Sequence, residues 1–258
     1  MNIKQGAGSV LAIAAVATAG WFLYPLVAEP EPPPPFFADW GAVIVAGDWR
    51  AANGRPSDVF DNGRRELAKK FISVGFRPEN VLQYSVFPQN YPHEQNLLPS
   101  AAEEITAGLQ TLSTAAPGGC MVYFTSHGTE KGIIIGDRLV DPQPIADRIG
   151  EACGDRPTVV IVSACFAGQF IGPLRGPNRI VLTAARPDRS SFGCGEQDEY
   201  TFFDACVLQE FDRAANFSEL ASFVDVCVKK RETELKVDPP SEPQFWLGAN
   251  VAYTLNWR

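Results

Sequence analysis

The sequence places one cysteine and one histidine in the same setting, each at the end of a hydrophobic segment. Cys165 ends the run in VVIVSACFAGQF (159–170), and His127 ends the run in MVYFTSHGT (121–129). A thiolate attacks carbonyl carbon, and a neighbouring imidazole can remove the thiol proton and later give it to a leaving amine. If the two ends lie side by side, the pair can therefore cleave a peptide bond.

Small residues next to this pair suit the same chemistry. Gly128 follows the histidine, and Ala167 and Gly168 follow the cysteine. Glycine lets the backbone approach a substrate closely, and we expect the N–H groups of Gly128 and Cys165 to form an oxyanion hole. A single cysteine at a strand end is more often a small core residue. It is the joint placement of the two side chains that favours catalysis.

The elements that must position the pair alternate between apolar and amphipathic segments from residue 38 onward. Strands are predicted at residues 41–47, 80–87, 120–126, 158–164, 179–185 and 251–257, with a short hairpin at 132–140. Helices are predicted at residues 58–76, 100–112, 142–152, 202–214 and 218–235, two of them opened by the capping boxes Ser100/Glu103 and Asn216/Glu219. Strands that are apolar throughout and separated by helices predict a mainly parallel sheet covered on both faces.

This sheet explains how the two candidate residues meet. His127 follows the third predicted strand and Cys165 the fourth, and 165 − 127 = 38 residues allow one crossover between them. Neighbouring strands lie about 4.8 Å apart, and open parallel sheets bind ligands outside the carboxyl ends of their strands. Both side chains would then face one substrate-binding edge.

Other function classes have little support in the sequence. The formal net charge is −8, with 22 basic and 30 acidic residues, which disfavours nucleic acid as a partner. There is no G-x-G-x-x-G motif after the first strand, no G-x-x-x-x-G-K motif and no C-x-x-C pair. His93, the second of two histidines, follows no strand and is interpreted as a surface residue. We expect neither a metal nor another cofactor.

The amino-terminal region differs from the rest of the chain. Residues 6–28 carry no charge and are long enough to span a bilayer as a helix, and residues 29–37 form a proline-rich tether. Two interpretations remain, an uncleaved signal anchor or a signal peptide cleaved after Ala17-Thr18-Ala19. We therefore expect residues 1–28 to be an anchor or signal peptide. Residues 38–258 form a single domain, placed across the membrane because Lys4 stays inside.

An exported domain can oxidise its cysteines, of which this chain has six. Cys120 precedes one predicted strand and Cys153 lies shortly before the next, at the same edge of a parallel sheet. A disulfide between these two is expected. Cys194, Cys206 and Cys227 can supply a second bridge, with one thiol left over.

The segments VYFTSHG and VVIVSACFAG resemble the peptidase C13 family of cysteine proteases. This family contains legumain and the catalytic subunit of the glycosylphosphatidylinositol transamidase, and the similarity is strongest to its bacterial, membrane-attached branch. It extends over about residues 40–250. The resemblance implies a caspase-like α/β/α sandwich with a mainly parallel central sheet, and a catalytic dyad of Cys165 and His127.

The resemblance also implies further site residues. Asn53 would orient the imidazole, and the pocket for the residue before the cut would contain Arg55, Ser163, Ser190, Ser191 and Asp204. A carboxamide side chain can accept from Arg55 and donate to Asp204, which predicts Asn before the scissile bond. Asp would fit only when one carboxyl is protonated. The alternative interpretation of Arg55 and Asp204 is a structural ion pair.

Two positions depart from the legumain pattern. Ser163 replaces an acidic residue of the pocket, which is expected to widen the specificity, and Ser126 replaces an Asp implicated in ligation. We expect a membrane-tethered or exported cysteine endopeptidase acting on protein or peptide substrates, in the bacterial inner membrane with its catalytic domain in the periplasm. The alternatives are a catalytically silent peptide-binding domain and a transpeptidase acting on membrane-associated substrates.

Overall fold

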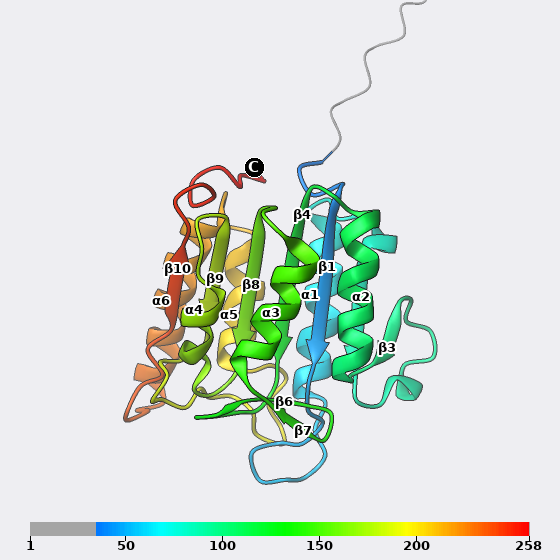
Figure 1. Cartoon of the computed structure of the whole chain (residues 1–258). Helices are drawn as coiled ribbons and strands as arrows, with labels where there is room; N and C mark the ends of the chain where they lie inside the picture. Colours follow the sequence, from blue (N-terminus) through cyan, green and yellow to red (C-terminus); the bar gives the residue numbers. More distant parts are fainter. Residues whose placement is uncertain (1–34, 258) are drawn as a thin grey trace, which may run out of the picture. The chain divides into compact units, whose positions relative to one another are not determined.

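The computed structural model describes residues 35–257, which form one sheet with helices on both faces (Figure 1). The seven strands have the order β10-β9-β8-β4-β1-β2-β3, and all neighbours are parallel except β10 and β9. Their bounds are β1 Trp40–Ala46, β2 Val81–Ser85, β3 Leu97–Pro99, β4 Gly119–Thr125, β8 Thr158–Ser163, β9 Arg179–Thr183 and β10 Gln244–Leu247. A second small sheet joins β5 Gly128–Thr129, β6 Gly132–Ile135 and β7 Arg138–Val140.

Helices cover both faces of the large sheet because successive strand residues point to opposite sides. On β1, Ala42 and Ile44 belong to the core under α1, α5 and α6, whereas Val43 and Val45 belong to the core under α2 and α3. The helix bounds are α1 Val59–Ser73, α2 Ala102–Ala115, α3 Pro142–Cys153, α4 Ile171–Leu174, α5 Phe202–Phe211 and α6 Phe217–Glu234. Short 3-10 turns occur at η1 Pro78–Asn80, η2 Pro88–Asn90 and η3 Ala167–Phe170. Strands buried on both faces explain the continuous apolar segments.

The carboxyl ends of the parallel strands meet at one edge of the sheet, at the bottom of Figure 1. The loop after β1 and the small hairpin sheet lie at the same edge. The predicted membrane-spanning segment and most of the predicted tether lie outside the described residues. Within residues 35–257, no helix combines the length and the apolar character needed to cross a membrane.

The predicted helix starts had different outcomes. The Asn216 side chain accepts a hydrogen bond from the Glu219 N–H at 3.0 Å, as expected for the start of α6. The capping role of Ser100 is wrong, because α2 begins at Ala102 after the cap residue Ala101. The Ser100 N–H instead donates to the Ser85 carbonyl, so Ser100 still continues the pairing of β3 with β2.

The predicted terminal strand at residues 251–257 is also wrong. The strand that closes the sheet is β10, which runs antiparallel to β9. Residues 249–254 form turns instead, and Val251 and Leu255 are buried in the core under α6. The apolar pattern there reflects burial of a turn rather than a period-2 strand.

Two disulfides cross-link the domain. Cys120–Cys153 confirms the predicted pair, and Cys206–Cys227 joins α5 to α6. Within the described chain Cys165 and Cys194 remain as free thiols. The left-over thiol of the second group is therefore Cys194.

Candidate active site

His127 and Cys165 lie at the ends of two adjacent strands. Thr125 of β4 pairs with Ser163 of β8, so the residues two positions further along each strand lie at the same level. A Cβ atom at Gly128 would lie 2.1 Å from the Cys165 carbonyl oxygen, which shows that the two segments touch and that glycine is required. Both side chains are half-buried at the open edge of the sheet. The predicted adjacency of the two strand ends is present in the structure.

The imidazole of His127 is oriented by a backbone carbonyl. Its Nε2 atom lies 2.8 Å from the Arg50 carbonyl oxygen, and the edge of the Phe60 ring packs against it with centroids 5.0 Å apart. Because a carbonyl can only accept, Nε2 must carry the proton in this contact. In the neutral ring Nδ1 then carries no proton and has its lone pair available to accept one, which is the state required of a general base.

The loop that presents this carbonyl is built as a narrow hairpin. The Ala51 N–H donates to the Arg55 carbonyl at 2.8 Å and the Ser57 N–H donates to the Trp49 carbonyl at 2.9 Å. Buried Asp48 accepts hydrogen bonds from the N–H groups of Trp49 and Arg50 and from the Arg50 guanidinium. The Arg50 carbonyl is therefore held in place by its neighbours on both sides.

Asn53 does not contact the imidazole in the described chain, which corrects the expectation from the resemblance. Its Oδ1 accepts from the Arg55 N–H at 3.0 Å, and its Nδ2 donates to Glu196 at 3.3 Å. The first of these contacts is a local turn that Asn side chains commonly close. The exposed Asn53 thus shapes the loop tip, while Arg50 orients His127.

Ser191 contacts the sulfur of Cys165. Its N–H donates to Cys165 Sγ at 3.3 Å, its hydroxyl lies 3.6 Å from the same atom, and the thiol donates to its carbonyl at 3.5 Å. The segment is held by a hydrogen bond from the Phe166 N–H to the Arg189 carbonyl at 2.7 Å. Ser190 is exposed. Of the predicted Ser-Ser pair, Ser191 is therefore the member at the thiol.

Two backbone N–H groups at the site are available to an oxyanion. Within the described chain, the Cys165 N–H has no acceptor. In the antiparallel pair of β5 and β6, the Ile134 N–H donates to the His127 carbonyl. Hydrogen-bonded and non-hydrogen-bonded pairs alternate along such strands, so the next pair, Gly128 with Ile133, is not hydrogen-bonded and the Gly128 N–H points away from β6. These are the two N–H groups expected to form the oxyanion hole.

Asp204 is fully buried behind the site. Its carboxylate accepts from the Tyr123 hydroxyl at 2.7 Å and the Thr125 hydroxyl at 2.5 Å. Its backbone N–H donates to the hydroxyl of Thr201, the residue that caps the start of α5. Burial raises the pKa of the Asp204 carboxyl, and hydrogen bonds from Thr125 and Tyr123 offset part of this rise. Ser163, also buried, bonds to Thr201 at 3.0 Å. Asp204 and Ser163 therefore belong to a closed polar cluster.

The predicted pocket of Arg55 with Asp204 is not formed. Arg55 is 71% exposed and pairs with Glu196 at 3.3 Å, whereas Asp204 is 0% exposed. The two side chains have different partners, so the structural ion pair considered as an alternative is absent as well among the described residues. The acidic partner of Arg55 is Glu196, which the sequence analysis missed.

Asp204→Asn is expected to flatten the pH dependence of stability. The unfolded carboxyl loses its proton at about pH 3.9, whereas the folded protein retains it to higher pH because the pKa of Asp204 is raised. The wild type therefore loses stability as the pH rises above about 4. Asn reproduces the protonated form, so the variant should become more stable relative to the wild type as the pH increases. Urea denaturation at pH 4, 6 and 8 measures this difference.

Asp147→Asn, at an exposed position of α3, serves as the control. Its stability relative to the wild type should not vary with pH in the same way. A difference between Asp204→Asn and the wild type that is the same at all three pH values would contradict the raised pKa of the buried Asp204 carboxyl.

Cys194 differs from Cys165 in its surroundings. It packs against Ala46, Val59 and Phe60, and its carbonyl accepts from the Ala52 N–H at 2.8 Å. Burial, followed by the neighbouring Cys165, raises the pKa of the Cys194 thiol to about 11. A thiol that stays protonated at neutral pH is a weak nucleophile, so Cys165 is the better candidate of the two.

Other features of the surface do not compete with this site. A groove of about 560 Å³ lies between α2, α3 and the β6–β7 hairpin, and its lining contains neither His127 nor Cys165. Within residues 35–257, no group of three or more His, Cys, Asp or Glu side chains could hold a metal ion.

Comparison with known proteins agrees with this description. Residues 79–221, more than half of the chain, match the family model of the peptidase C13 family, and they include both His127 and Cys165. No curated protein shows significant similarity to the chain.

Solved structures give the same fold. Caspase-1 from Spodoptera frugiperda superposes with a TM-score of 0.56 at 14% identity, covering 81% of this chain and 86% of that one. The structure titled pro-sf-caspase-1 has a TM-score of 0.56 at 13% identity, covering 80% of this chain and 90% of that one. At these identities the likeness shows the fold, a caspase-like α/β architecture with a mostly parallel sheet. With the family match over the segment that carries both catalytic candidates, the chain belongs to the peptidase C13 family.

Proposed function

We propose that the protein is a cysteine endopeptidase that uses Cys165 as the nucleophile and His127 as the general base and acid. The observation that supports this most strongly is the pairing of His127 and Cys165 at adjacent strand ends, with Nε2 of the imidazole committed to the Arg50 carbonyl. Nδ1 is then free to take the thiol proton. Membership of the peptidase C13 family adds further support, because the matched residues 79–221 contain both His127 and Cys165.

The reaction has two steps. The Cys165 sulfur attacks the scissile carbonyl as its proton moves to His127 Nδ1, and the oxyanion is stabilised by the N–H groups of Cys165 and Gly128. The C–N bond breaks as the imidazolium returns its proton to the leaving amine, which leaves an acyl-enzyme. Water, deprotonated by the same nitrogen, then hydrolyses the thioester and restores the thiol. No cofactor takes part.

Ser191 must change its contacts for this to occur. In the structure its N–H and carbonyl both face the sulfur. An extended substrate can take over these two backbone groups, as in the addition of a strand. We propose that the segment around Ser191 binds the substrate backbone before the cut.

The side chain before the cut is proposed to be Asn, recognised by Arg55 and Glu196. A guanidinium can donate to the carboxamide oxygen and a carboxylate can accept from its NH₂ group. Arg55 and Glu196 already pair at 3.3 Å, and Glu196 follows Ser191 by five residues in the chain. Asp at this substrate position would meet the charge of Glu196 and is expected to be cleaved only at acid pH.

Incubation with a diverse peptide library under mild reduction, with cleavage sites identified by mass spectrometry, tests this proposal. We expect internal cleavage, enriched after Asn, and no cleavage by Cys165→Ala. Cleavage without a preference for Asn would reject the role of Arg55 and Glu196 but keep the peptidase. No cleavage at all would favour the peptide-binding alternative, and products joined to an added amine would favour the transpeptidase.

We also propose that residues 1–28 attach the protein to the bacterial inner membrane or direct its export, with the peptidase domain in the periplasm. The two disulfides support an oxidising compartment. Protease added to spheroplasts should degrade the domain, and non-reducing gels of the cellular protein should show both bridges. A protected, fully reduced domain in the cytoplasm would contradict this placement.

A further inference from the structure

Two aromatic side chains lie along the same sheet edge as the catalytic pair. The strand order β9-β8-β4-β1-β2 places, one after another, the segment with Ser191, then Cys165, His127, Trp49 and Phe87. Trp49 lies three residues after the end of β1, and Phe87 lies two residues after the end of β2. The two rings contact each other with centroids 5.4 Å apart. We call this pair the aromatic shelf.

The chemistry of acyl transfer assigns a direction to this edge. The acyl part of the substrate stays on the sulfur, whereas the leaving amine must lie where the imidazole can protonate it. Ser191, which contacts the sulfur, lies on the β9 side of Cys165, and His127 lies on the β4 side. The leaving amine, and the residues that follow the cut, therefore extend toward β1 and β2, where the aromatic shelf lies.

Trp49 is held in a fixed position at the edge. The backbone N–H of Trp49 donates to the Asp48 carboxylate at 2.7 Å, and its backbone carbonyl accepts from the Ser57 N–H. The Arg50 guanidinium lies 5.8 Å from the ring centroid and is bound to Asp48 through two hydrogen bonds of 2.8 and 2.9 Å. The charge beside the ring is thus already paired, and the ring is half-buried.

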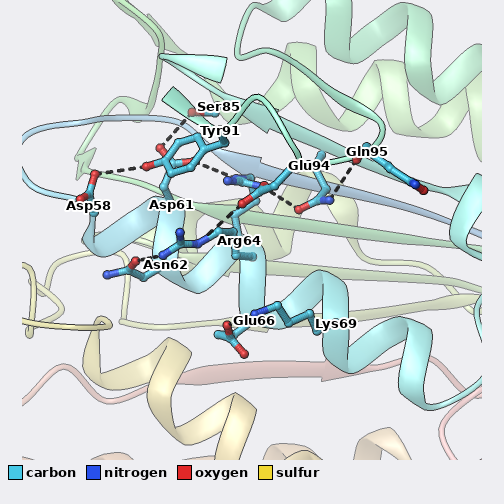
Figure 2. Close-up of polar contacts among 12 residues, drawn as sticks. Asp58, Asp61, Asn62, Arg64, Glu66, Lys69, Ser85, Tyr91, Glu94 and Gln95 are labelled. Atoms are coloured by element: carbon cyan, nitrogen blue, oxygen red, sulfur yellow. Dashed lines mark hydrogen bonds and ion pairs between the residues drawn. The ribbon is translucent and has the colours of Figure 1, made fainter. Parts of the chain in front are cut away.

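Phe87 is held by a buried polar network, drawn in Figure 2. The Ser85 hydroxyl accepts from the Phe87 backbone N–H at 3.2 Å. It donates to Asp61 at 2.9 Å, the contact that Figure 2 shows. Asp61 is in turn bound by Arg64, which is fully buried and also reaches Glu94 at 2.5 Å. Residues 85 to 94 are therefore tied at both ends to α1.

Tyr91 fastens the middle of this loop. Its hydroxyl donates to Asp58 at 3.1 Å (Figure 2). The guanidinium groups of Arg64 and Arg65 lie 5.1 and 5.3 Å from its ring centroid. Because these contacts already fix the loop, it loses little conformational entropy when a substrate binds, and the entropic cost of binding is lower. The position of Phe87, like that of Trp49, is therefore fixed before a substrate binds.

We propose that the aromatic shelf of Trp49 and Phe87 binds a large apolar or aromatic side chain of the substrate, one or two residues after the cut. This inference rests on the proposed peptidase function. The two rings are half-buried and fixed in position, and the Arg50 charge beside Trp49 is already paired with Asp48. Such rings favour apolar and aromatic partners. We expect a preference of about tenfold in kcat/KM for Phe over Gly at the preferred position, which is the usual scale for one apolar pocket.

Two sets of fluorogenic peptides test the shelf. All share one sequence up to the cut, and they carry Phe or Gly at the first or second position after it. The wild-type protein should prefer Phe by about tenfold, and Trp49→Ala and Phe87→Ala should each reduce the ratio to about threefold or less. Tyr253→Ala, which removes an exposed aromatic ring at a distant turn, should keep the full ratio. Phe87→Leu keeps the apolar packing if the Ala variant fails to fold, and should reduce the ratio less.

A second measurement reports the same surface independently of cleavage rates. The acyl-enzyme formed from an ester substrate is offered phenylalanine amide or glycine amide, and the transfer product is compared with the hydrolysis product. Transfer to phenylalanine amide should exceed transfer to glycine amide about tenfold, and this excess should shrink in the shelf variants. Equal rates for Phe and Gly peptides, or an unchanged ratio in both shelf variants, would overturn this inference alone. Failure of the wild type to cleave any peptide or ester would overturn the proposed function instead.

Discussion

Replacement of Cys165 by alanine is expected to lower peptide hydrolysis by at least about 10⁴-fold, because loss of the nucleophile of a catalytic pair removes most of the rate enhancement. The sulfur has no substitute at the site. Its neighbour Ser191 presents a hydroxyl rather than a thiol, and burial raises the pKa of the Cys194 thiol to about 11, which keeps that thiol protonated at neutral pH. The measurement is kcat/KM for the best library peptide, with circular dichroism confirming that the variant is folded.

Cys194→Ala is the matched control, because it removes the other free thiol of the described chain. It should keep kcat/KM within a few-fold of the wild type, since Cys194 packs against the apolar side chains of Val59 and Phe60 and its thiol stays protonated at neutral pH. An active Cys165→Ala protein together with an inactive Cys194→Ala protein would reverse the assignment of the nucleophile.

Arg64→Met is expected to lower the free energy of unfolding by about 3–5 kcal/mol, the usual cost of removing one partner of a buried ion pair. Arg64 is fully buried and bonds to Asp61, Gln83 and Glu94. Burial already raises the pKa of Asp61, and the Arg64 charge is the main factor that opposes this rise. Methionine has a similar volume, so the loss reports the missing charge and hydrogen bonds rather than a cavity. Urea denaturation monitored by tryptophan fluorescence measures it.

Arg138→Met is the control for this change. Arg138 pairs with Glu103, but both side chains are more than two-thirds exposed, so the loss should stay below about 1 kcal/mol. Equal small losses in the two variants would show that the Arg64 network contributes little to stability. In that case the loop carrying Phe87 would have no rigid support.

The positions of His127 and Cys165 at adjacent strand ends were predictable because they follow from the pattern of the strands. Continuous apolar runs identify β1, β4, β8 and β9, and parallel strands bring equivalent ends to one edge. The structure pairs Thr125 with Ser163, which places the histidine and the cysteine together as expected. The bridge between Cys120 and Cys153 followed from the same register at the opposite edge.

The groups that complete the site could not be predicted in the same way. Arg50 acts through its carbonyl oxygen, an atom that every residue carries, so no residue type marks the position. Asn53 and Asp204 have the residue types expected from the resemblance, but backbone geometry directs Asn53 to the loop tip and burial encloses Asp204 among hydroxyl groups. Glu196 lies in an irregular segment whose path the sequence pattern does not determine.

The end of the chain shows a related limit. The apolar residues after Gly248 predict a strand, yet Val251 is buried in a turn, Leu255 is buried just after it, and β10 closes the sheet. A short apolar run satisfies either arrangement, because periodicity alone does not distinguish a strand from another buried segment.

The most direct test of the account is to trap the acyl-enzyme. A peptidyl 4-nitrophenyl ester that ends in Asn is mixed with the protein, the reaction is quenched with acid during the first turnover, and the protein is digested and analysed by mass spectrometry. One acyl group per molecule should be found on Cys165, and it should be absent in Cys165→Ala and greatly reduced in His127→Gln. Turnover without an acyl group on Cys165, or acylation that is unchanged when His127 is replaced, would contradict the catalytic pair.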